Sequence, residues 1–259
     1  TMTVAVQHVL ITGASRGIGA ALAGAYAAPG VRLSLSGRDT AALADVADAA
    51  RAEGAEVAAE VVDVRDGGAV AAWIARAEAV RPIDLAIANA GINRPDDPPG
   101  AELDNLKLML DTNVLGVARV VNACLPTMTA RGRGQLALIS SLAGITGFGG
   151  MASYGASKAA IRAYGQALRA DLAGRGVKVS VVCPGFVDTA MAAQVQGTKM
   201  GEWSAERAAR YVKRGLARNR GLIAFPPLES FGVRLLTILP GILMDPISRG
   251  FRFRVDERG

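Results

Sequence analysis

Histidine and cysteine are scarce in this chain of 259 residues, which has one histidine, His8, and two cysteines, Cys124 and Cys183. A zinc site built from these residue types is not expected, and we expect no metal site. A Ser-His-Asp hydrolase is not expected either, because His8 would have to be its base. Both cysteines lie in apolar runs, VVNACLP and VSVVCPG, which indicates buried, reduced thiols in a cytoplasmic protein.

Aromatic residues make up only 5% of the chain, so alanine, valine and leucine must fill most of the core. The sequence is 51% hydrophobic and 20% charged, a balance typical of a globular domain and not of a disordered chain. No apolar run reaches the roughly 18–20 residues that span a bilayer. The nearest candidate, LLTILPGILM, is interrupted by Pro240 and Gly241. The N-terminal stretch lacks a signal-peptide pattern, so we expect a cytoplasmic protein.

The net charge is +6, and nucleic acid, an anionic surface or a phosphorylated cofactor would each account for it. Six of the cations are clustered between residues 207 and 220 and are interpreted as the solvated face of a helix. No nucleic-acid-binding motif accompanies them, so no nucleic-acid partner is expected.

Short apolar runs alternate along the chain with longer alanine-rich segments of helical period. The expected strands are HVLIT, RLSLS, EVAAEVV, DLAIA, QLALIS, KVSVVC and LIAF. The expected helices cover about 17–28, 40–53, 67–80, 104–131, 152–174 and 204–219. Apolar strands separated by helices predict a parallel sheet covered on both faces. We therefore expect an α/β, doubly wound (Rossmann-type) sheet of about seven strands, in a single domain over residues 1–259.

The first expected strand leads directly into TGASRGIG, with glycines at positions 13, 17 and 19, and a helix follows. Glycines at this place allow a tight turn and let a pyrophosphate approach backbone N–H groups at the helix N-terminus. Their spacing differs from the commonest dinucleotide fingerprint, and a plain glycine-rich turn is the alternative. The position between strand and helix favours a dinucleotide site.

The end of the second expected strand, SLSGRD, should lie beside the adenosine ribose of a dinucleotide. An acid there would favour NAD, whereas this sequence has Arg38, with Arg16 inside the glycine turn. Guanidinium groups bind phosphate through forked, charge-assisted hydrogen bonds. We therefore predict NADP (NADPH) as the preferred cofactor, with NAD as the alternative. Asp39 argues for that alternative unless it points away as a helix cap.

The segment SYGASKAAIRAYGQAL places Tyr154 four residues before Lys158 in an expected helix, so both side chains leave the same face. On its own this pair is typical of an exposed helix face. A free tyrosine has a pKa of about 10, and a nearby cation favours the phenolate. The alternative is therefore a proton-transfer site in which the lysine lowers the pKa of the tyrosine.

Seven motifs occur in order: TGASRGIG, Asp63 in VVDV, NAG, Asn113 in DTNVLG, Ser141 in ISS, YGASK and PG. With Ser141 thirteen residues before the tyrosine, this set resembles the short-chain dehydrogenase/reductase family over about residues 8–190. Ala88 departs from the pattern, because many members have asparagine there.

The resemblance implies a carbonyl–alcohol oxidoreductase with four catalytic residues. Tyr154 would exchange a proton with the substrate oxygen and Ser141 would hold that oxygen. Lys158 would lower the pKa of the tyrosine and bind the nicotinamide ribose, and Asn113 would complete a proton relay through water. The expected cofactor-binding residues are Gly13, Ser15, Arg16, Gly17, Ile18, Gly19, Arg38, Asp63, Val64, Asn89, Ala90, Gly91, Tyr154, Lys158, Pro184, Gly185, Val187 and Thr189.

Two segments extend beyond this core pattern. Residues 188–203 follow a strand end as an irregular segment and are expected to form a substrate loop or lid. Residues 227–259 resemble the longer apolar C-terminus of some members. This tail could cap the active site, pack on a partner subunit or make peripheral membrane contact, and packing on its own domain is the preferred interpretation. By the same resemblance, helices 104–131 and 152–174 would pair in a homodimer or homotetramer.

Two other functions remain open at this point. A dinucleotide-binding sensor or non-catalytic subunit would not need Asn113, Ser141, Tyr154 and Lys158 together. An epimerase or dehydratase relative would usually carry a larger substrate domain than the roughly seventy residues after position 190. The small-molecule carbonyl or alcohol substrate and the favoured direction are not given by the sequence.

Overall fold

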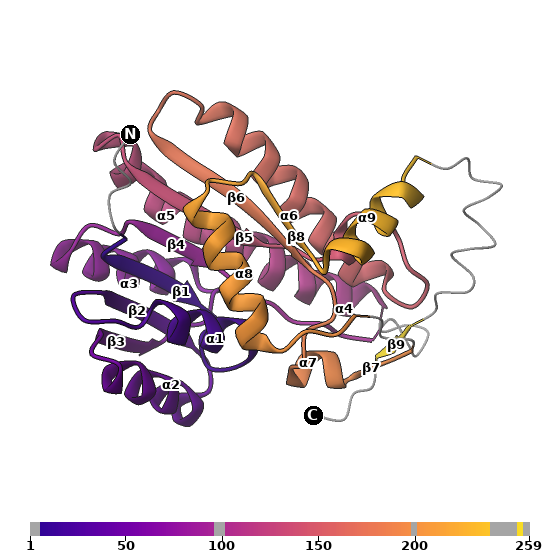
Figure 1. Cartoon of the computed structure of the whole chain (residues 1–259), viewed down its shortest axis with the longest axis horizontal. Coiled ribbons are helices and arrows are strands. Elements are labelled where there is room, and N and C mark those ends of the chain that lie inside the picture. Colours follow the sequence, from indigo (N-terminus) through magenta and orange to yellow (C-terminus); the bar gives the residue numbers. More distant parts are fainter. Residues whose placement is uncertain (1–5, 96–101, 198–200, 239–252, 256–259) are drawn as a thin grey trace.

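The computed structural model describes residues 6–95, 102–197, 201–238 and 253–255. Its centre is a sheet of seven parallel strands in the order β3-β2-β1-β4-β5-β6-β8 (Figure 1). The strands are β1 (His8–Thr12), β2 (Arg32–Gly37), β3 (Glu56–Val61), β4 (Leu85–Ala88), β5 (Gly134–Ile139), β6 (Val177–Pro184) and β8 (Leu222–Phe225). The predicted doubly wound α/β fold in one domain is confirmed.

Helices cover both faces of the sheet, and alternate residues of a strand face opposite ways. In β1, Val9 and Ile11 belong to one buried hydrophobic cluster, whereas Leu10 belongs to a second cluster on the opposite face of the sheet. This alternation follows from the two-residue period of a strand. Because both faces are buried, the middle of the strand, VLI in HVLIT, is a continuous apolar run.

The main helices lie close to their predicted ranges. They are α1 (Gly17–Tyr26), α2 (Thr40–Ala52), α3 (Gly67–Val80), α4 (Glu102–Met109), α5 (Gly116–Ala130), α6 (Ala152–Asp171) and α8 (Ala205–Ala217). A π-helical turn, η1 (Leu110–Leu115), joins α4 to α5. Leu103–Ala130 is long and apolar enough to cross a membrane by length and composition, with 44% of its most apolar window buried. Because it packs against α3 and α6 in the core, we interpret it as a core helix.

Several short elements were not predicted. The segment expected to be irregular at 188–203 contains α7 (Ala190–Ala193) and β7 (Val195–Gln196). After β8 the chain forms α9 (Pro227–Leu236), and β9 (Arg254–Val255) pairs antiparallel with β7. A 3-10 turn, η2 (Leu142–Gly144), precedes α6. The sequence signals for these elements are weak because each is short or begins at a proline.

The chain order of the sheet reverses between β1 and β4, which are neighbours. In open α/β sheets, ligands bind at the carboxyl ends of the strands beside such a reversal. The segments after β1, β2, β3, β4, β5 and β6, together with α6, carry most of the predicted site residues to this edge. Residues 239–252 and 256–259 lie outside the described residues, and the expected membrane contact of the tail falls largely on them.

Candidate active site

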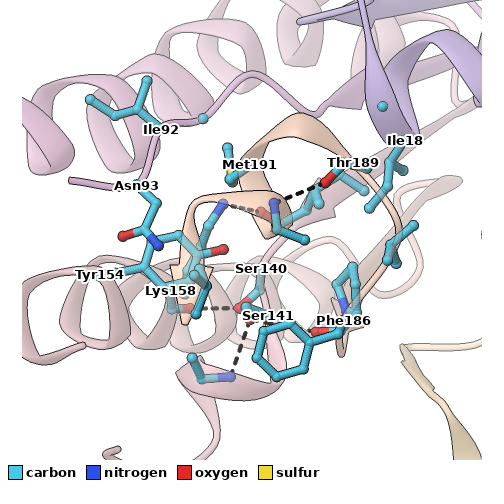
Figure 2. Close-up of a pocket in the computed structure, with 18 of the residues that line it drawn as sticks. Ile18, Ile92, Asn93, Ser140, Ser141, Tyr154, Lys158, Phe186, Thr189 and Met191 are labelled. Carbon is cyan, nitrogen blue, oxygen red and sulfur yellow. Dashed lines mark hydrogen bonds between the residues drawn. The ribbon is translucent and has the colours of Figure 1, made fainter. Parts of the chain in front are cut away.

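A cleft of about 1110 Å³ opens at the carboxyl edge of the sheet. It is lined by the loop after β1, the ends of β2 and β3, the NAG segment, α6, the loop after β6 and α9. All of the predicted site residues line it except Gly19 and Asn113, which lie just behind its wall. Residues separated by up to about 170 positions are thus brought to one surface (Figure 2).

The glycine turn after β1 forms the floor at one end of the cleft. Gly13 has a φ of 65°, and a Cβ on Gly19 would lie 2.2 Å from the Gly13 carbonyl oxygen. Gly19 therefore lets α1 begin directly against the turn, and this packing role explains why it is buried behind the lining. The N-cap residue of α1, Arg16, makes no side-chain cap, whereas Asp39 caps α2 and Asp66 caps α3. The first turn of α1 thus offers N–H groups to an anion.

Thr12, at the end of β1, ties the glycine turn to the NAG segment. Its hydroxyl oxygen accepts hydrogen bonds from the N–H groups of Asn89 and Ala90, both at 3.1 Å. The Asn89 amide donates in return to the carbonyl oxygens of Thr12 and Gly13, each at 3.0 Å. These four bonds fix the relative positions of the β1 and β4 ends. Thr12 was quoted in the sequence motif but not predicted as a site residue.

Charged residues gather at the end of the cleft beside β2 and β3. Asp39 Oδ1 accepts from Ala42 N at 3.1 Å, and Asp39 Oδ2 pairs with Arg16 Nη2 at 2.7 Å. Both carboxylate oxygens of Asp39 are therefore engaged, as the cap alternative anticipated. Arg38 is exposed beside them and lines the cleft.

Asp63, at the same end, is engaged by Arg65. Two guanidinium nitrogens of Arg65 contact the carboxylate, the shortest at 2.6 Å, and this contact lowers the pKa of Asp63. Arg65 was not among the predicted site residues. The pairing leaves Asp63 ionised and held at the cleft edge beside Val64.

Tyr154, Lys158 and Ser141 lie together at the other end of the cleft, with Phe186 beside them (Figure 2). Tyr154 and Lys158 are one turn apart on α6, and Lys158 Nζ lies 5.7 Å from the Tyr154 ring centroid. Ser141 caps η2 by accepting from Ala143 N at 3.1 Å, which holds its hydroxyl at the cleft wall.

Lys158 is almost completely buried. Its ammonium group donates to the carbonyl oxygen of Ile139 at 3.1 Å, and the Ser140 hydroxyl donates to the Lys158 carbonyl oxygen at 2.7 Å. Burial lowers the pKa of Lys158 to about 8. The cation is thus locked beside Tyr154 by backbone contacts at the end of β5.

The expected lowering of the Tyr154 pKa is wrong for the protein as it stands. Burial raises the pKa of Tyr154 to about 12, and a hydrogen bond with Ser141 offsets only part of that rise. The sequence argument counted the neighbouring cation and omitted desolvation, which disfavours the phenolate more strongly here. Tyr154 is partly exposed at the cleft wall. The protein that surrounds the rest of its side chain excludes water and so causes the rise in pKa.

Asn113 lies in the π-helical turn η1, behind the cleft. It accepts from Ile92 N at 2.8 Å and donates to Ile92 O at 2.9 Å and to the Ser157 hydroxyl at 3.0 Å. π-Turns inside helices are frequent at functional sites. The buried amide thus fixes the segment after NAG against α6. It does not line the cleft, and the predicted relay through water stays a prediction.

The loop after β6 closes the cleft opposite the glycine turn. Pro184, Gly185, Val187 and Thr189 line it, and Thr189 caps α7 by accepting from Ala192 N at 3.2 Å. The Ser141 hydroxyl donates to the Pro184 carbonyl oxygen at 3.4 Å, which links this loop to η2.

Further lining residues were not predicted from the sequence. They come from the loop before α6, from α7 and β7, from α9 and from the segment before β9, and include Phe148, Met151, Met191, Leu228, Phe231 and Phe253. No motif marks them, because each contributes only apolar surface. These apolar residues lie in segments outside the sheet, and only the three-dimensional structure shows that they line one cleft.

Comparison with known proteins agrees with this geometry. A family model described as short chain dehydrogenase matches residues 7–199. An uncharacterized oxidoreductase from Myxococcus xanthus is 34% identical over 247 residues, covering 95% of this chain and 98% of the relative. A galactitol 2-dehydrogenase (L-tagatose-forming) from Cereibacter sphaeroides is 39% identical over 184 residues, covering 70% of this chain and 71% of the relative.

A solved structure has a closely similar fold. It is a short-chain dehydrogenase from Sphingobium yanoikuyae in complex with NADPH, with a TM-score of 0.78 and 26% identity. The match covers 90% of this chain and 96% of that chain. The matched family region ends before α8, β8 and α9, so the wall formed by α9 lies outside it.

Proposed function

The chain belongs to the short-chain dehydrogenase family of oxidoreductases, and from that premise we propose that it interconverts a carbonyl and a secondary alcohol with NADP(H) as the preferred cofactor. The observation that carries the proposal is the convergence of Ser141, Tyr154 and Lys158 on the cleft wall across from the glycine turn. A sensor would need the turn but not these three side chains.

The cofactor supplies the hydride when it is bound. In this proposal Tyr154 donates its phenolic proton to the substrate oxygen during reduction, and Ser141 holds that oxygen through its hydroxyl. Lys158 stabilises the phenolate that results, because its ammonium group is fixed beside the ring. Asn113 acts as a positioning residue through Ile92 and Ser157, and the predicted water relay through it stays a prediction.

The raised pKa of Tyr154 keeps its phenol protonated at neutral pH. With a pKa of about 12 the phenol is protonated there, so the residue is ready to donate a proton and poorly prepared to accept one. Oxidation of an alcohol would need the phenolate, whose population rises with pH. We therefore propose that Tyr154 is in its proton-donating form, the form that carbonyl reduction requires, at neutral pH.

The residues present fit a dinucleotide. The uncapped start of α1 and the turn with Ser15, Gly17 and Ile18 would hold the pyrophosphate. Asp63 and Val64 would contact the adenine, and Asn89 to Gly91 would form the floor beneath the ribose. Pro184, Gly185, Val187 and Thr189 would hold the nicotinamide end.

The preference for NADP rests on Arg16 and Arg38. Asp39 would repel a 2′-phosphate, but its carboxylate is already bound by Arg16 and by the N-terminus of α2. Arg38 is then the exposed cation beside the predicted ribose position. The similar solved structure, the short-chain dehydrogenase from Sphingobium yanoikuyae, is a complex with NADPH, which supports the proposal of NADP(H) for this chain.

The segment 188–203 is proposed as a substrate loop, since Thr189 and Met191 line the cleft and α7 lies at its mouth.

We also propose a cytoplasmic homodimer or homotetramer. Leu103 and Leu115, on the long α4–α5 helix, are 60% and 50% exposed, which suits a subunit contact. Light scattering after size-exclusion chromatography measures the assembly.

The enzyme proposal is tested by a panel of aldehydes, ketones and quinones, with turnover read as NADPH absorbance. Native protein should consume NADPH with at least one panel member, and Tyr154→Phe should lower that rate by roughly a hundredfold or more. Both proteins should bind NADPH comparably by fluorescence. Unchanged turnover in Tyr154→Phe would refute the proton role, and a silent panel with intact NADPH binding would favour the sensor.

A further inference from the structure

Helix α9 forms an apolar wall of the cleft that is open to solvent. Leu228 and Phe231 line the cleft, yet they are 79% and 65% exposed. Gly232, Val233 and Leu236 line it further along the same helix. From Leu228 to Leu236 the helix advances about 12 Å, at 1.5 Å per residue. An exposed apolar strip of this kind beside a catalytic cleft is typical of a ligand-binding groove.

The other walls at this end of the cleft are apolar as well. Phe253 packs edge-on against Phe148 and tilted against Phe186, with ring centroids 5.8 Å and 5.5 Å apart. All three phenylalanines line the cleft, together with Met151 and Met191. Met191, on α7, is 37% exposed at the mouth. The aromatic rings are fixed by contacts with one another and do not close the cleft.

Few of the described residues that line this end of the cleft are charged. Among the described lining residues away from the β2 and β3 ends, the charged ones are Lys158, Arg94 and Glu229. Lys158 is buried beside Tyr154, and Arg94 and Glu229 have opposite signs. Apart from the buried Lys158, the charges of these described lining residues cancel, whereas an apolar chain would cover surface that is now exposed to water.

The size of the cleft leaves room for such a chain. Its volume of about 1110 Å³ exceeds the roughly 300–1,000 Å³ of a usual small-molecule site. A dinucleotide would occupy the end formed by the glycine turn, Arg38 and Asp63. The part bounded by α9, α7 and the phenylalanine cluster remains beyond Tyr154 and Ser141.

We propose that this apolar chamber, bounded by α9, Met191 and the Phe148–Phe186–Phe253 cluster, binds the alkyl chain of a medium- to long-chain carbonyl substrate. The inference rests on the proposed reductase function and names the substrate class of the same site. The carbonyl carbon lies at Tyr154 and Ser141, and the chain extends along α9 and covers Leu228 and Phe231.

The test is a series of unbranched methyl ketones, from butanone to decanone, reduced with NADPH. In native protein kcat/KM should rise about two- to fourfold for each added methylene until the chain outgrows the chamber. Phe231→Ser and Leu228→Ser should each lower kcat/KM for decanone roughly tenfold, with a loss that shrinks as the ketone is shortened. Leu235→Ser is the matched control: Leu235 is 46% exposed on the same helix but does not line the cleft, and its profile should equal the native one.

A flat profile in active native protein would overturn the inference, as would a rising profile that neither serine variant changes. A preference for fused-ring ketones with a flat alkyl series would also overturn it. Calorimetric binding of the matching alcohols, butanol to decanol, is measured in parallel without turnover. Binding that strengthens with chain length in a protein that reduces no carbonyl would uphold the chamber and refute the reductase proposal.

Discussion

Lys158 Nζ lies 5.7 Å from the centroid of the Tyr154 ring, one turn away on α6, and is held there by the Ile139 carbonyl oxygen. Lys158 is only 4% exposed, and burial lowers its pKa from 10.5 to about 8. The folded protein therefore keeps an ammonium group in a place that disfavours it. The burial of Lys158 therefore lowers the stability of the folded protein while placing a cation beside Tyr154.

Replacing Lys158 with methionine should stabilise the protein at neutral pH. Because the folded-state pKa is the lower one, the destabilisation is complete below about pH 8 and disappears as pH rises through the unfolded value of 10.5. The gain should be up to about 3 kcal/mol at neutral pH and should vanish near the upper value. Urea unfolding at both pH values measures it.

The exposed Lys178 on β6 provides the control, and Lys178→Met should change the free energy of unfolding by less than about 0.5 kcal/mol at either pH. A Lys158→Met protein that is less stable than native at neutral pH would show that the hydrogen bond to Ile139 outweighs the burial of charge. The same variant should lose reductase activity, which separates function from stability.

The rate of carbonyl reduction should show an alkaline limb caused by Lys158. Below about pH 8 the lysine is charged and Tyr154, with a pKa of about 12, is protonated, so both groups have the form that reduction needs. Above about pH 8 the lysine loses its charge while the phenol remains, and kcat/KM should fall by about tenfold per pH unit. A pH–rate profile with an NADPH-oxidising substrate checks this. A profile that stays flat well above pH 8 would contradict the assignment.

Cofactor choice should depend on Arg38 and Asp39 in opposite directions. Arg38→Ala should weaken NADPH binding by about ten- to a hundredfold and NADH binding little, because only NADPH carries the 2′-phosphate. Asp39→Asn should strengthen NADPH binding, because asparagine keeps the cap of α2 while the charge that binds Arg16 is removed. Fluorescence titration with each cofactor measures both. Equal losses for NADPH and NADH in Arg38→Ala would refute the preference.

The seven-stranded sheet was predictable because its strands are short, mostly apolar runs separated by longer alanine-rich segments of helical period. Strand β1 and helix α1, for example, follow from HVLIT and the glycine turn alone. The ordered motifs predicted Ser141, Tyr154 and Lys158 as members of one catalytic site, and all three line the cleft. Each of these residues lies in a short motif at a fixed spacing, so the sequence alone was enough to predict it.

The electrostatics and the outer walls of the site were not predictable in the same way. The pKa of Tyr154 depends on how much protein surrounds it, which a spacing of four residues does not contain. Helix α9 begins with Pro227 and carries its cleft-lining side chains in no known motif. Phe253 reaches the cleft only because β9 pairs with β7, nearly sixty residues earlier in the chain.

The contact between Gly150 and Phe253 offers a test of whether the chain after α9 builds a wall of the site. Gly150 has a φ of 78°, and a Cβ there would lie 1.8 Å from the Phe253 carbonyl oxygen, whereas a Cβ on the exposed Gly147 would meet nothing within 4 Å. Gly150→Ala should therefore displace Phe253 and β9 and add about 1–2 kcal/mol of backbone strain, while Gly147→Ala should behave as native protein.

Hydrogen exchange at Phe253, whose N–H donates to the Gly149 carbonyl oxygen at 2.9 Å, should accelerate only in Gly150→Ala. NADPH affinity should be equal in all three proteins, since the cofactor end is remote, and KM for an apolar ketone should rise only in Gly150→Ala. Equal KM values with accelerated exchange would mean that the segment covers the domain without forming part of the substrate wall.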